Sequence, residues 1–340
     1  MRALTHQQRL HLINSEQLFE NYREALHQSR TYAYGMRWKR VRGVDYLFRE
    51  RDRRGNGKLL GRRNPETEAR LRQFHDRKAA AKQRLAQIKA QLDEQARLNK
   101  ALRLGRVPRV VARILRALDE ARLGDAFTVL GTQALYAYEA HAGVQLLLEL
   151  LASGDVDLLY DTRQRLTLVS HRLEGQGLLG LLKKADRSFE CVRRQGFRAA
   201  NAGQFMVDFV IAPQPLHQAE PITFAEEDLV AAEVPGLQWL LNVPALETVA
   251  IDEHGWPVPF RVPDPRAFAF HKAWLSQRID REPVKKPRDL AQACAMAQLI
   301  RDALPQYAFA DPLMALPKAI ANVAWLESHC GLTGLADAGD

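Results

Sequence analysis

The sequence of 340 residues has few cysteines and no long apolar run. Cys191, Cys294 and Cys330 are odd in number and far apart, so they indicate neither a disulfide framework nor a zinc knuckle and fit a reducing compartment. The absence of about 18 uninterrupted apolar residues argues against a membrane-spanning helix. Residues 1–8 lack the apolar core of a secretory signal. We therefore expect a cytoplasmic protein with no membrane partner.

Positive charge is abundant but unevenly distributed. Residues 1–124 contain 30 basic and 13 acidic residues, a net charge of +17, whereas residues 125–340 contain 19 and 27, a net charge of −8. A chain of this length exceeds the usual size of a single hydrophobic core. We expect a basic N-terminal arm over residues 1–124, a central domain over residues 125–215 and a mostly helical C-terminal region over residues 216–340.

The arm is expected to begin with a helix over residues 10–29, followed by a β-hairpin that turns near Gly43. The hairpin interleaves aromatic residues, which stack on bases, with cations, which meet phosphates, and this pattern favours RNA as a partner. The alternative is that the aromatics form a core and the cations are solvated or pair with the acidic domain. The residues concerned are Arg37, Trp38, Lys39, Arg40, Arg42, Tyr46, Phe48, Arg49, Arg51, Arg53 and Arg54.

A long helix is expected over residues 65–104, because Asn64 can cap it, Pro65 suits its first position and Gly105 follows its end. Its apolar residues follow a spacing near 3.5 only in part, so an intramolecular helical hairpin and a coiled coil are equally good interpretations. In the hairpin, a second helix over residues 109–123 returns along the first.

From residue 127 onward, short apolar strands alternate with helices. The sequence predicts a helix that opens at Gly131 and a hairpin around residues 252–255. The other predicted elements are strands at residues 127–130, 155–160, 165–169 and 204–211, and helices at residues 177–185, 265–278, 287–304 and 316–329.

Asp155 and Asp157 are the strongest candidates for chemistry. Side chains alternate along a strand, so both carboxylates of Asp155-Val156-Asp157 project from the same face. Their repulsion on a largely apolar strand is costly unless a cation offsets it, and Mg²⁺ prefers such oxygen ligands. Alone, the motif is weak evidence, because many such pairs are solvated or cap turns.

Two neighbouring features strengthen this interpretation. A predicted strand runs into a helix through Gly131 and Thr132, where exposed amides can hold a phosphate. Asp208 lies mid-strand among apolar residues, and a third carboxylate of this kind suits a two-metal phosphoryl-transfer site. The alternative for Asp208 is a structural ion pair with Arg198 or another base.

This ordered set resembles the signature of the DNA polymerase β-like nucleotidyltransferase superfamily: a hydrophobic residue, Gly, a small residue, Asp-x-Asp and a third Asp on a neighbouring strand. The resemblance covers about residues 127–213, and residues 131–135 and 155–159 are similar to a bacterial family of nucleotidyltransferase-fold proteins of unassigned substrate. It implies an α+β fold with a mixed sheet, preceded by the basic hairpin and long helix and followed by a helical region.

The C-terminal region carries a second resemblance. Residues 271–278 and 285–290 are similar to the basic helical motifs of abortive-infection-type nucleotidyltransferase toxins, in which a lysine faces the nucleotide triphosphate. The resemblance assigns that role to Lys272. A basic solvated helix face is an equally good interpretation of this segment.

Together the resemblances imply a metal-dependent nucleotidyltransferase that moves an NMP from an NTP, such as ATP, to an acceptor hydroxyl and releases pyrophosphate. RNA, tRNA in particular, is the favoured acceptor, and a protein or small-molecule acceptor stays open. The alternative is a catalytically inert nucleotidyltransferase fold that binds nucleic acid. The residues that would perform catalysis and hold Mg²⁺ or Mn²⁺ are Asp155, Asp157 and Asp208. Those that would bind the NTP are Gly131, Thr132 and Lys272.

One literal motif points elsewhere. Residues 175–180 match Gly-x-Gly-x-x-Gly, but no strand leads directly into them, so we interpret them as a turn before a helix rather than a dinucleotide fingerprint. The histidines show no zinc-ligand spacing, and no serine stands in a nucleophile elbow.

Overall fold

A computed structural model of the protein divides the chain into two compact units. It describes residues 1–52, 54–164, 166–173, 175–214, 220–309, 316–317 and 320–335, so Arg53 of the predicted basic hairpin and Arg165 of a predicted strand lie outside the described residues. The arm unit comprises Ile13–Leu98, and the core unit comprises Met1–Leu12 and Asn99–Asp340.

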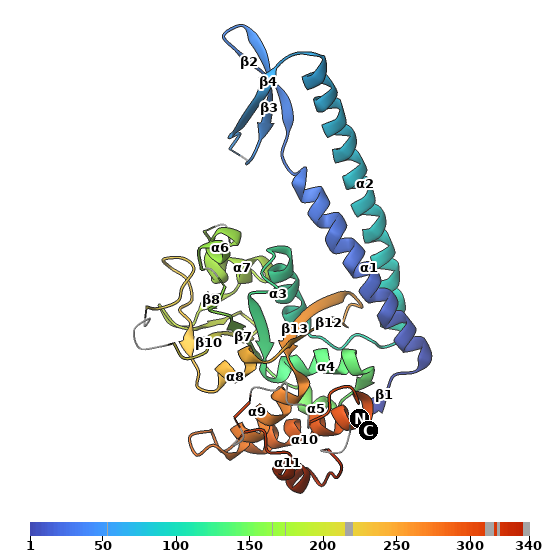
Figure 1. The fold of residues 1–340 in the computed structure, drawn as a ribbon, viewed down its shortest axis with the longest axis vertical. Coiled ribbons are helices and arrows are strands. Elements are labelled where there is room, and N and C mark those ends of the chain that lie inside the picture. Colours follow the sequence, from blue (N-terminus) through green and yellow to red (C-terminus); the bar gives the residue numbers. More distant parts are fainter. Residues whose placement is uncertain are drawn as a thin grey trace. The chain divides into compact units, whose positions relative to one another are not determined.

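The arm unit consists of two long helices and a small sheet, and the sheet lies between the two helices in the sequence. α1 (His6–Thr31) and α2 (Pro65–Ala101) lie side by side (Figure 1). An antiparallel sheet of order β2-β3-β4 connects them, formed by β2 (Met36–Val41), β3 (Val44–Glu50) and β4 (Gly57–Arg62). The predicted hairpin is therefore confirmed and extended by a third strand.

The two helices pack through small and apolar side chains. Phe19 and Ala25 of α1 and Leu92 of α2 are at most 2% exposed, and Glu24 and Arg84 approach to 3.8 Å across the pair. The long helix thus belongs to an intramolecular helical hairpin, which was one of the two interpretations. Its partner is α1 rather than the expected helix over residues 109–123.

The second helix expected in the arm lies elsewhere. α3 (Arg109–Glu120) belongs to the core unit, where it packs against α7 (Gly177–Ala185) and β13 (Pro257–Pro263). Its buried side chains, which include Val111, Ile114 and Leu118, recur on one helical face and fill the core of that unit. The prediction that this helix returns along the long helix is wrong, because its apolar face has a different partner.

A mixed sheet of six strands forms the centre of the core unit. The strand order is β5-β7-β10-β9-β8, with β11 also paired to β10. β7 and β10 run parallel, whereas β5 and β9 are antiparallel to the strands they join. The strands are β5 (Phe127–Leu130), β7 (Asp155–Tyr160), β8 (Glu190–Cys191), β9 (Arg198–Ala200), β10 (Met206–Ile211) and β11 (Ala232–Glu233).

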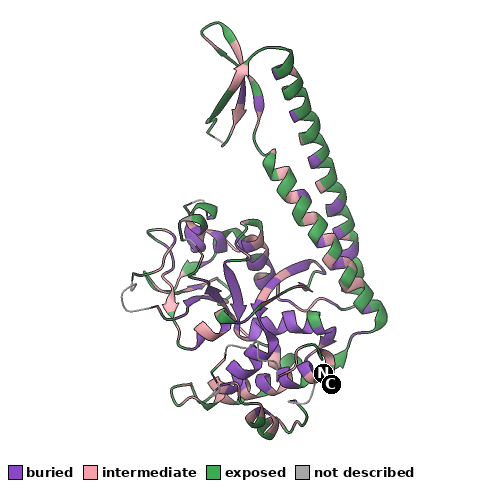
Figure 2. Ribbon diagram, viewed as in Figure 1, coloured by how far each residue is buried: buried purple, intermediate pink, exposed green. Residues whose placement is uncertain are grey.

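Helices and a second hairpin enclose this sheet, and buried residues concentrate in the sheet and the helices against it (Figure 2). The fold is α+β, as the sequence predicted. The remaining elements are β1 (Arg2–Ala3), the 3₁₀ helix η1 (Gly131–Ala134), α4 (Leu135–Ala142), β6 (Val144–Gln145), α5 (Leu148–Leu151), α6 (Leu166–Arg172), α8 (Leu237–Asn242), β12 (Ala245–Ile251), α9 (Pro265–Gln277), α10 (Lys286–Ala303) and α11 (Val323–Cys330).

Two predicted elements differ from the structure. Residues 166–169 of the strand expected at residues 165–169 belong to α6 instead, and Val169 and Leu173, four residues apart, are both buried, as a helical face requires. The last helix, expected from residue 316, begins as α11 at Val323, where the side chain of Asn322 accepts a hydrogen bond from the Trp325 amide at 2.9 Å. Residues 318–319 of the expected span lie outside the described residues.

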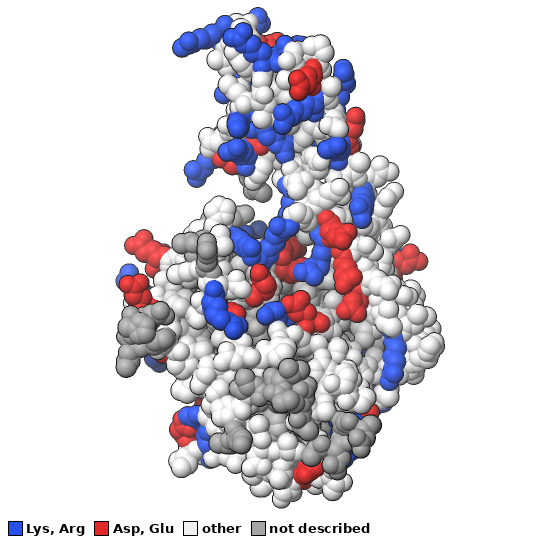
Figure 3. Space-filling view, viewed as in Figure 1, with Lys and Arg blue, Asp and Glu red and all other residues white. Residues whose placement is uncertain are grey.

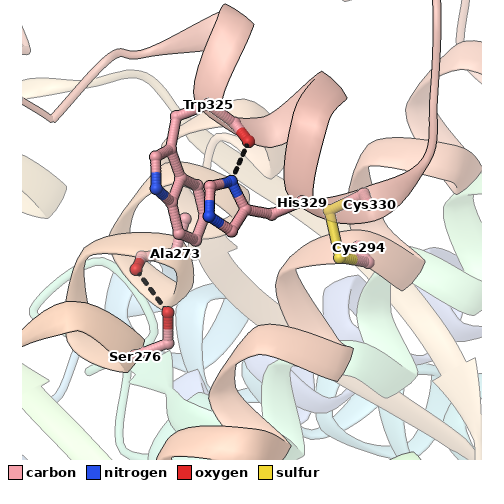
Figure 4. Close-up of a disulfide and its surroundings, with 6 residues drawn as sticks. All are labelled: Ala273, Ser276, Cys294, Trp325, His329 and Cys330. Carbon is pink, nitrogen blue, oxygen red and sulfur yellow. Dashed lines mark hydrogen bonds between the residues drawn. A yellow bond between two sulfur atoms is a disulfide. The ribbon is translucent and has the colours of Figure 1, made fainter.

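The cysteines also differ from expectation. Cys294 on α10 and Cys330 at the end of α11 form a disulfide (Figure 4). Beside it, the rings of Trp325 and His329 stack 4.0 Å apart, and the two residues are joined by a hydrogen bond from the His329 side chain to the Trp325 carbonyl. The few and distant cysteines predict no disulfide framework, but folding brings this pair together. Cys191 is a free, half-buried thiol.

Over the described residues, no helix has the combination of length and hydropathy needed to cross a bilayer.

Candidate active site

Two carboxylates stand on one face of β7, at its first and third positions. Asp155 and Asp157 are half-buried, whereas Val156 between them is 1% exposed, as alternation along a strand requires. The Ser153 hydroxyl donates a hydrogen bond to Asp155. Among the described residues, no donor forms a hydrogen bond with the Asp157 carboxylate. Its negative charge is therefore available to an incoming cation.

Asp208 of β10 lies beside this pair. It is the register partner of Asp157 in the parallel strands, and such positions are about 5 Å apart at the backbone. Its carboxylate, in a residue only 6% exposed, accepts two hydrogen bonds of 2.6 Å from Nε and Nη2 of Arg198. Arg198 faces Asp208 directly across the β9–β10 pair. The structure thus places Asp208 next to Asp157 and also pairs it with Arg198.

Gly131 brings the backbone against Asp157. It follows Leu130, the register partner of Asp157 in β5, and its φ of +64° lies in the left-handed region that favours glycine. A Cβ added at this position would lie 2.4 Å from Oδ2 of Asp157. Both the conformation and the close approach therefore require glycine at the turn from β5 into η1.

Thr132 is buried and its hydroxyl is occupied. Oγ1 accepts a hydrogen bond of 3.1 Å from Nε2 of Gln292 on α10, and the same amide group also donates to the carbonyl of Leu150 at 2.8 Å. This contact fastens the glycine turn to α10. In this geometry the Thr132 side chain supports the turn, and its hydroxyl is directed at Gln292.

Lys272 of α9 is buried in a network of charges. Its Nζ lies 2.9 Å from Oδ1 of Asp289 on α10, while Arg281 holds the other oxygen at 2.7 Å. Burial lowers the pKa of Lys272, and Asp289 and Asp157 act in the opposite direction. Asp289 thus pairs with two cations, Lys272 and Arg281. The three side chains together have a net charge of +1 close to Asp157.

These groups meet at a pocket of about 160 Å³ in the core unit. Gly131, Asp157 and Lys272 all line it, so the structure brings together three residues that the sequence placed in the site. Most of the other lining residues are apolar, which suits an apolar part of a ligand. The other lining residues are Leu130, Val210, Val234, Pro235, Leu237, Leu240, Phe268, His271, Leu275 and Arg281.

Comparison with protein families agrees with this geometry. A family model described as nucleotidyltransferase matches residues 109–316, which is more than half of the chain. The chain belongs to this nucleotidyltransferase family. No curated protein and no solved structure matches it. Membership indicates an NTP substrate and transfer of a nucleotidyl group, and the matched residues include every candidate site residue.

The carboxylates of the nucleotidyltransferase fit a divalent ion in part. In the part of the chain that the structure describes, no three His, Cys, Asp or Glu side chains are arranged to hold a metal ion. Asp155 and Asp157 nevertheless offer hard oxygen ligands on one face, as Mg²⁺ or Mn²⁺ requires. Asp208 differs, since both of its oxygens face the Arg198 guanidinium.

Burial of Asp157, together with repulsion from the neighbouring carboxylates, gives a prediction on how stability depends on pH. Burial, Asp155 and Asp208 raise the pKa of Asp157 to about 6. A raised carboxyl pKa means that the folded state binds the proton more tightly than the unfolded state, so stability is lost as the pH rises from about 4 to 6. Asp157→Asn is therefore expected to raise the metal-free free energy of unfolding by about 1–2 kcal/mol at pH 7.5 and to change it little below pH 4.

Urea unfolding in EDTA at several pH values measures this difference. Asp186→Asn is the matched control: hydrogen bonds from Ser188 lower the pKa of Asp186, so this variant is expected to lose stability at pH 7.5. If Asp157→Asn is less stable than the wild type at pH 7.5, this result would contradict the arrangement of charges described above.

Two residues at the site had no signal in the sequence. Arg281 lies in the loop between α9 and α10, and Gln292 lies on a buried face of α10. Neither occurs in a motif, and each reaches the site only because α9 and α10 pack against each other. Asp289 lies within residues 285–290, the segment similar to the toxin motifs, and forms the centre of the cation network.

The glycine-rich segment at residues 175–180 has a structural role. Gly177 begins α7, and a Cβ there would lie 2.2 Å from Oδ2 of Asp228. Asp228 accepts hydrogen bonds from the amides of Leu178 and Leu179 at 2.6 and 2.7 Å. A protein carboxylate thus occupies the helix N-terminus that a dinucleotide pyrophosphate would need.

Proposed function

We propose that the protein transfers an NMP from an NTP to an acceptor hydroxyl, in the manner of the DNA polymerase β-like superfamily and with a divalent ion. The observation that supports this most directly is the placement of Asp155, Asp157 and Asp208 on adjacent strands beside the Gly131 turn. Family membership supplies the reaction class, and the carboxylates supply the site for its metal.

In this reaction the acceptor oxygen forms a bond to the α-phosphorus, and the bond between that phosphorus and the bridging oxygen of pyrophosphate breaks. Asp155 and Asp157 would hold Mg²⁺ or Mn²⁺, which neutralises charge on the phosphates when bound. Asp208 is the carboxylate closest in register to this pair, and a lone pair that its bonds to Arg198 leave free would accept the proton of the acceptor hydroxyl. Lys272 and Arg281 place positive charge at the pocket where the triphosphate would lie.

A label-transfer assay tests the proposal. The wild type is incubated with Mg²⁺, bulk RNA and each α-³²P-labelled NTP in turn, beside Asp155→Ala/Asp157→Ala. Transfer in the wild type is expected to fall by at least about 10²–10³-fold in the variant, since the charge-neutralising group loses its ligands. The omission of Mg²⁺ should have the same effect. Equal RNA retention with no transfer in either protein would indicate an inert binding fold instead.

The sheet of the arm unit supports RNA as the acceptor. From Arg37 to Arg63, with both ends included, the sequence has eleven Lys and Arg residues and three acidic ones. Lys and Arg gather on this sheet in Figure 3. One face of the sheet packs on α2, where Met36, Leu47 and Phe74 form a small core. The opposite face carries Arg37, Lys39 and Arg62, so we propose that it binds the phosphate backbone.

The aromatic rings on the sheet are covered rather than open. Nζ of Lys39 lies 4.8 Å from the centre of the Phe48 ring, and Phe48 is 6% exposed. Arg62 donates a hydrogen bond of 3.2 Å to the Tyr46 hydroxyl. Because cations stand over the rings, this face suits contact with phosphates better than stacking on bases.

Charge reversal on this face tests the RNA proposal. Arg37→Glu/Lys39→Glu/Arg62→Glu is expected to lower RNA affinity at least tenfold and to reduce the slope of log K against log salt by about 2. Filter binding at several salt concentrations measures both. The control changes three exposed cations of the core unit, Arg122→Glu/Lys183→Glu/Arg187→Glu, by the same total charge. Equal losses in the two variants would contradict a specific RNA-binding face.

A further inference from the structure

A row of charged side chains crosses three strands of the core sheet. Arg198 of β9, Asp208 of β10 and Asp157 of β7 are consecutive register partners, so they share one face of the sheet. The order along the row is cation, carboxylate, carboxylate. Arg198 stands at the end of the row that is farther from Gly131.

The three carboxylates differ in what already binds them. Asp155 accepts a hydrogen bond from a neutral hydroxyl, that of Ser153. Among the described residues, the carboxylate of Asp157 accepts none. Asp208 alone bonds to a cation, through both of its oxygens and with two parallel N–H donors. A bidentate arginine–carboxylate pair of this geometry is among the strongest that side chains form, and the burial of Asp208 strengthens it.

We propose that Arg198 takes the place of one of the two metal ions of such a site. The protein binds one divalent ion, between Asp155 and Asp157, and Arg198 keeps Asp208 out of metal coordination. The guanidinium supplies a fixed positive charge beside the position of the acceptor oxygen. This inference rests on the proposed function and specifies how many ions that function uses.

The charges of the surroundings support a single ion. Lys272 lines the same pocket as Asp157, and Arg198 lies in the same register row, beyond Asp208. A guanidinium stays protonated at any pH at which the carboxylates are ionised, so Arg198, bound to Asp208, is a permanent cation in this row. A second ion at Asp208 would have to approach this permanent cation. One divalent ion together with Arg198 already balances the three carboxylates.

Counting bound ions tests the inference without measuring activity. The protein is saturated with a non-hydrolysable NTP analogue, and Mn²⁺ is titrated while free Mn²⁺ is followed by electron paramagnetic resonance. The wild type is expected to bind one ion per chain in the complex. Arg198→Gln, which frees Asp208, is expected to bind two. Asp208→Asn is expected to keep one, and Asp155→Asn/Asp157→Asn to bind none.

Two bound ions in the wild type, with one lost in Asp208→Asn, would overturn the inference and leave the proposed function intact. A single ion in Arg198→Gln would also overturn it, provided that its thermal unfolding midpoint shows a folded protein. Arg198→Lys, which keeps the charge but only one donor group, is the matched control and should stay at one ion. Failure of the proposed function is recognised separately, by the absence of label transfer in the wild type.

Discussion

Gly131→Ala is expected to lower nucleotidyl transfer by about 100-fold or more. The added methyl group would lie 2.4 Å from Oδ2 of Asp157, and alanine also disfavours the φ of +64° at this turn. The carboxylate or the turn must move, and a displacement of about 1 Å in a proposed metal ligand is enough for such a loss. The label-transfer assay, with kcat and KM determined separately, measures the effect.

Gly154→Ala is the matched control for this prediction. Gly154 immediately precedes Asp155, yet a Cβ there meets nothing within 4 Å. It is expected to keep transfer within about threefold of the wild type, because no ligand has to move. If Gly131→Ala keeps full activity and unfolds at the same midpoint as the wild type, activity does not require the carboxylate of Asp157 to lie where the structure places it.

The buried pair of Lys272 and Asp289 is expected to give the largest effect on stability. Asp289→Ala leaves the ammonium group of Lys272 buried without its carboxylate, which lowers the free energy of unfolding by about 3–5 kcal/mol. Asp280→Ala is the control, since Asp280 forms an exposed pair with Arg278 and its loss costs less than about 1 kcal/mol. Urea unfolding at pH 7.5 measures both.

A double variant separates the two roles of Lys272. Lys272→Met/Asp289→Leu replaces both charges with apolar groups and is expected to recover most of the lost stability. If Lys272 also faces the triphosphate, as the toxin resemblance implies, this folded variant should show a raised KM for the NTP. An unchanged KM would indicate that the pair is structural, and that Arg281, which lines the same pocket, supplies the positive charge.

The sequence pattern predicts a helix or a strand well where interactions between residues close in the sequence determine it. The strands β5 and β7 and the helix α7 have the predicted bounds, because turns and a change of periodicity limit each of them. The strand expected at residues 165–169 failed because its leucines and valine suit either structure, and only burial of Val169 and Leu173 selects the helix. The partner of α2 and the disulfide depend on contacts between distant segments, which no local pattern contains.

The residues of the candidate site divide in the same way, into those that a sequence motif predicts and those that only the fold brings together. Asp155, Asp157, Gly131 and the neighbouring strand with Asp208 follow from a motif whose order in the sequence reflects adjacent strands. The sequence does not indicate that the hydroxyl of Thr132 is bonded to Gln292, since the two residues are 160 positions apart. It named Arg198 as a structural alternative for Asp208, whereas the fold places both residues in one row with Asp157.

The register of β10 limits where this chain can gain or lose residues. One inserted residue between Met206 and Asp208 would turn the carboxylate to the opposite face of the sheet and separate it from both Asp157 and Arg198. The loop between α9 and α10, by contrast, has exposed positions such as Ile279, which is 98% exposed. Length variation among related chains is therefore expected at exposed positions of that loop away from Arg281, and strict length conservation in β7 and β10.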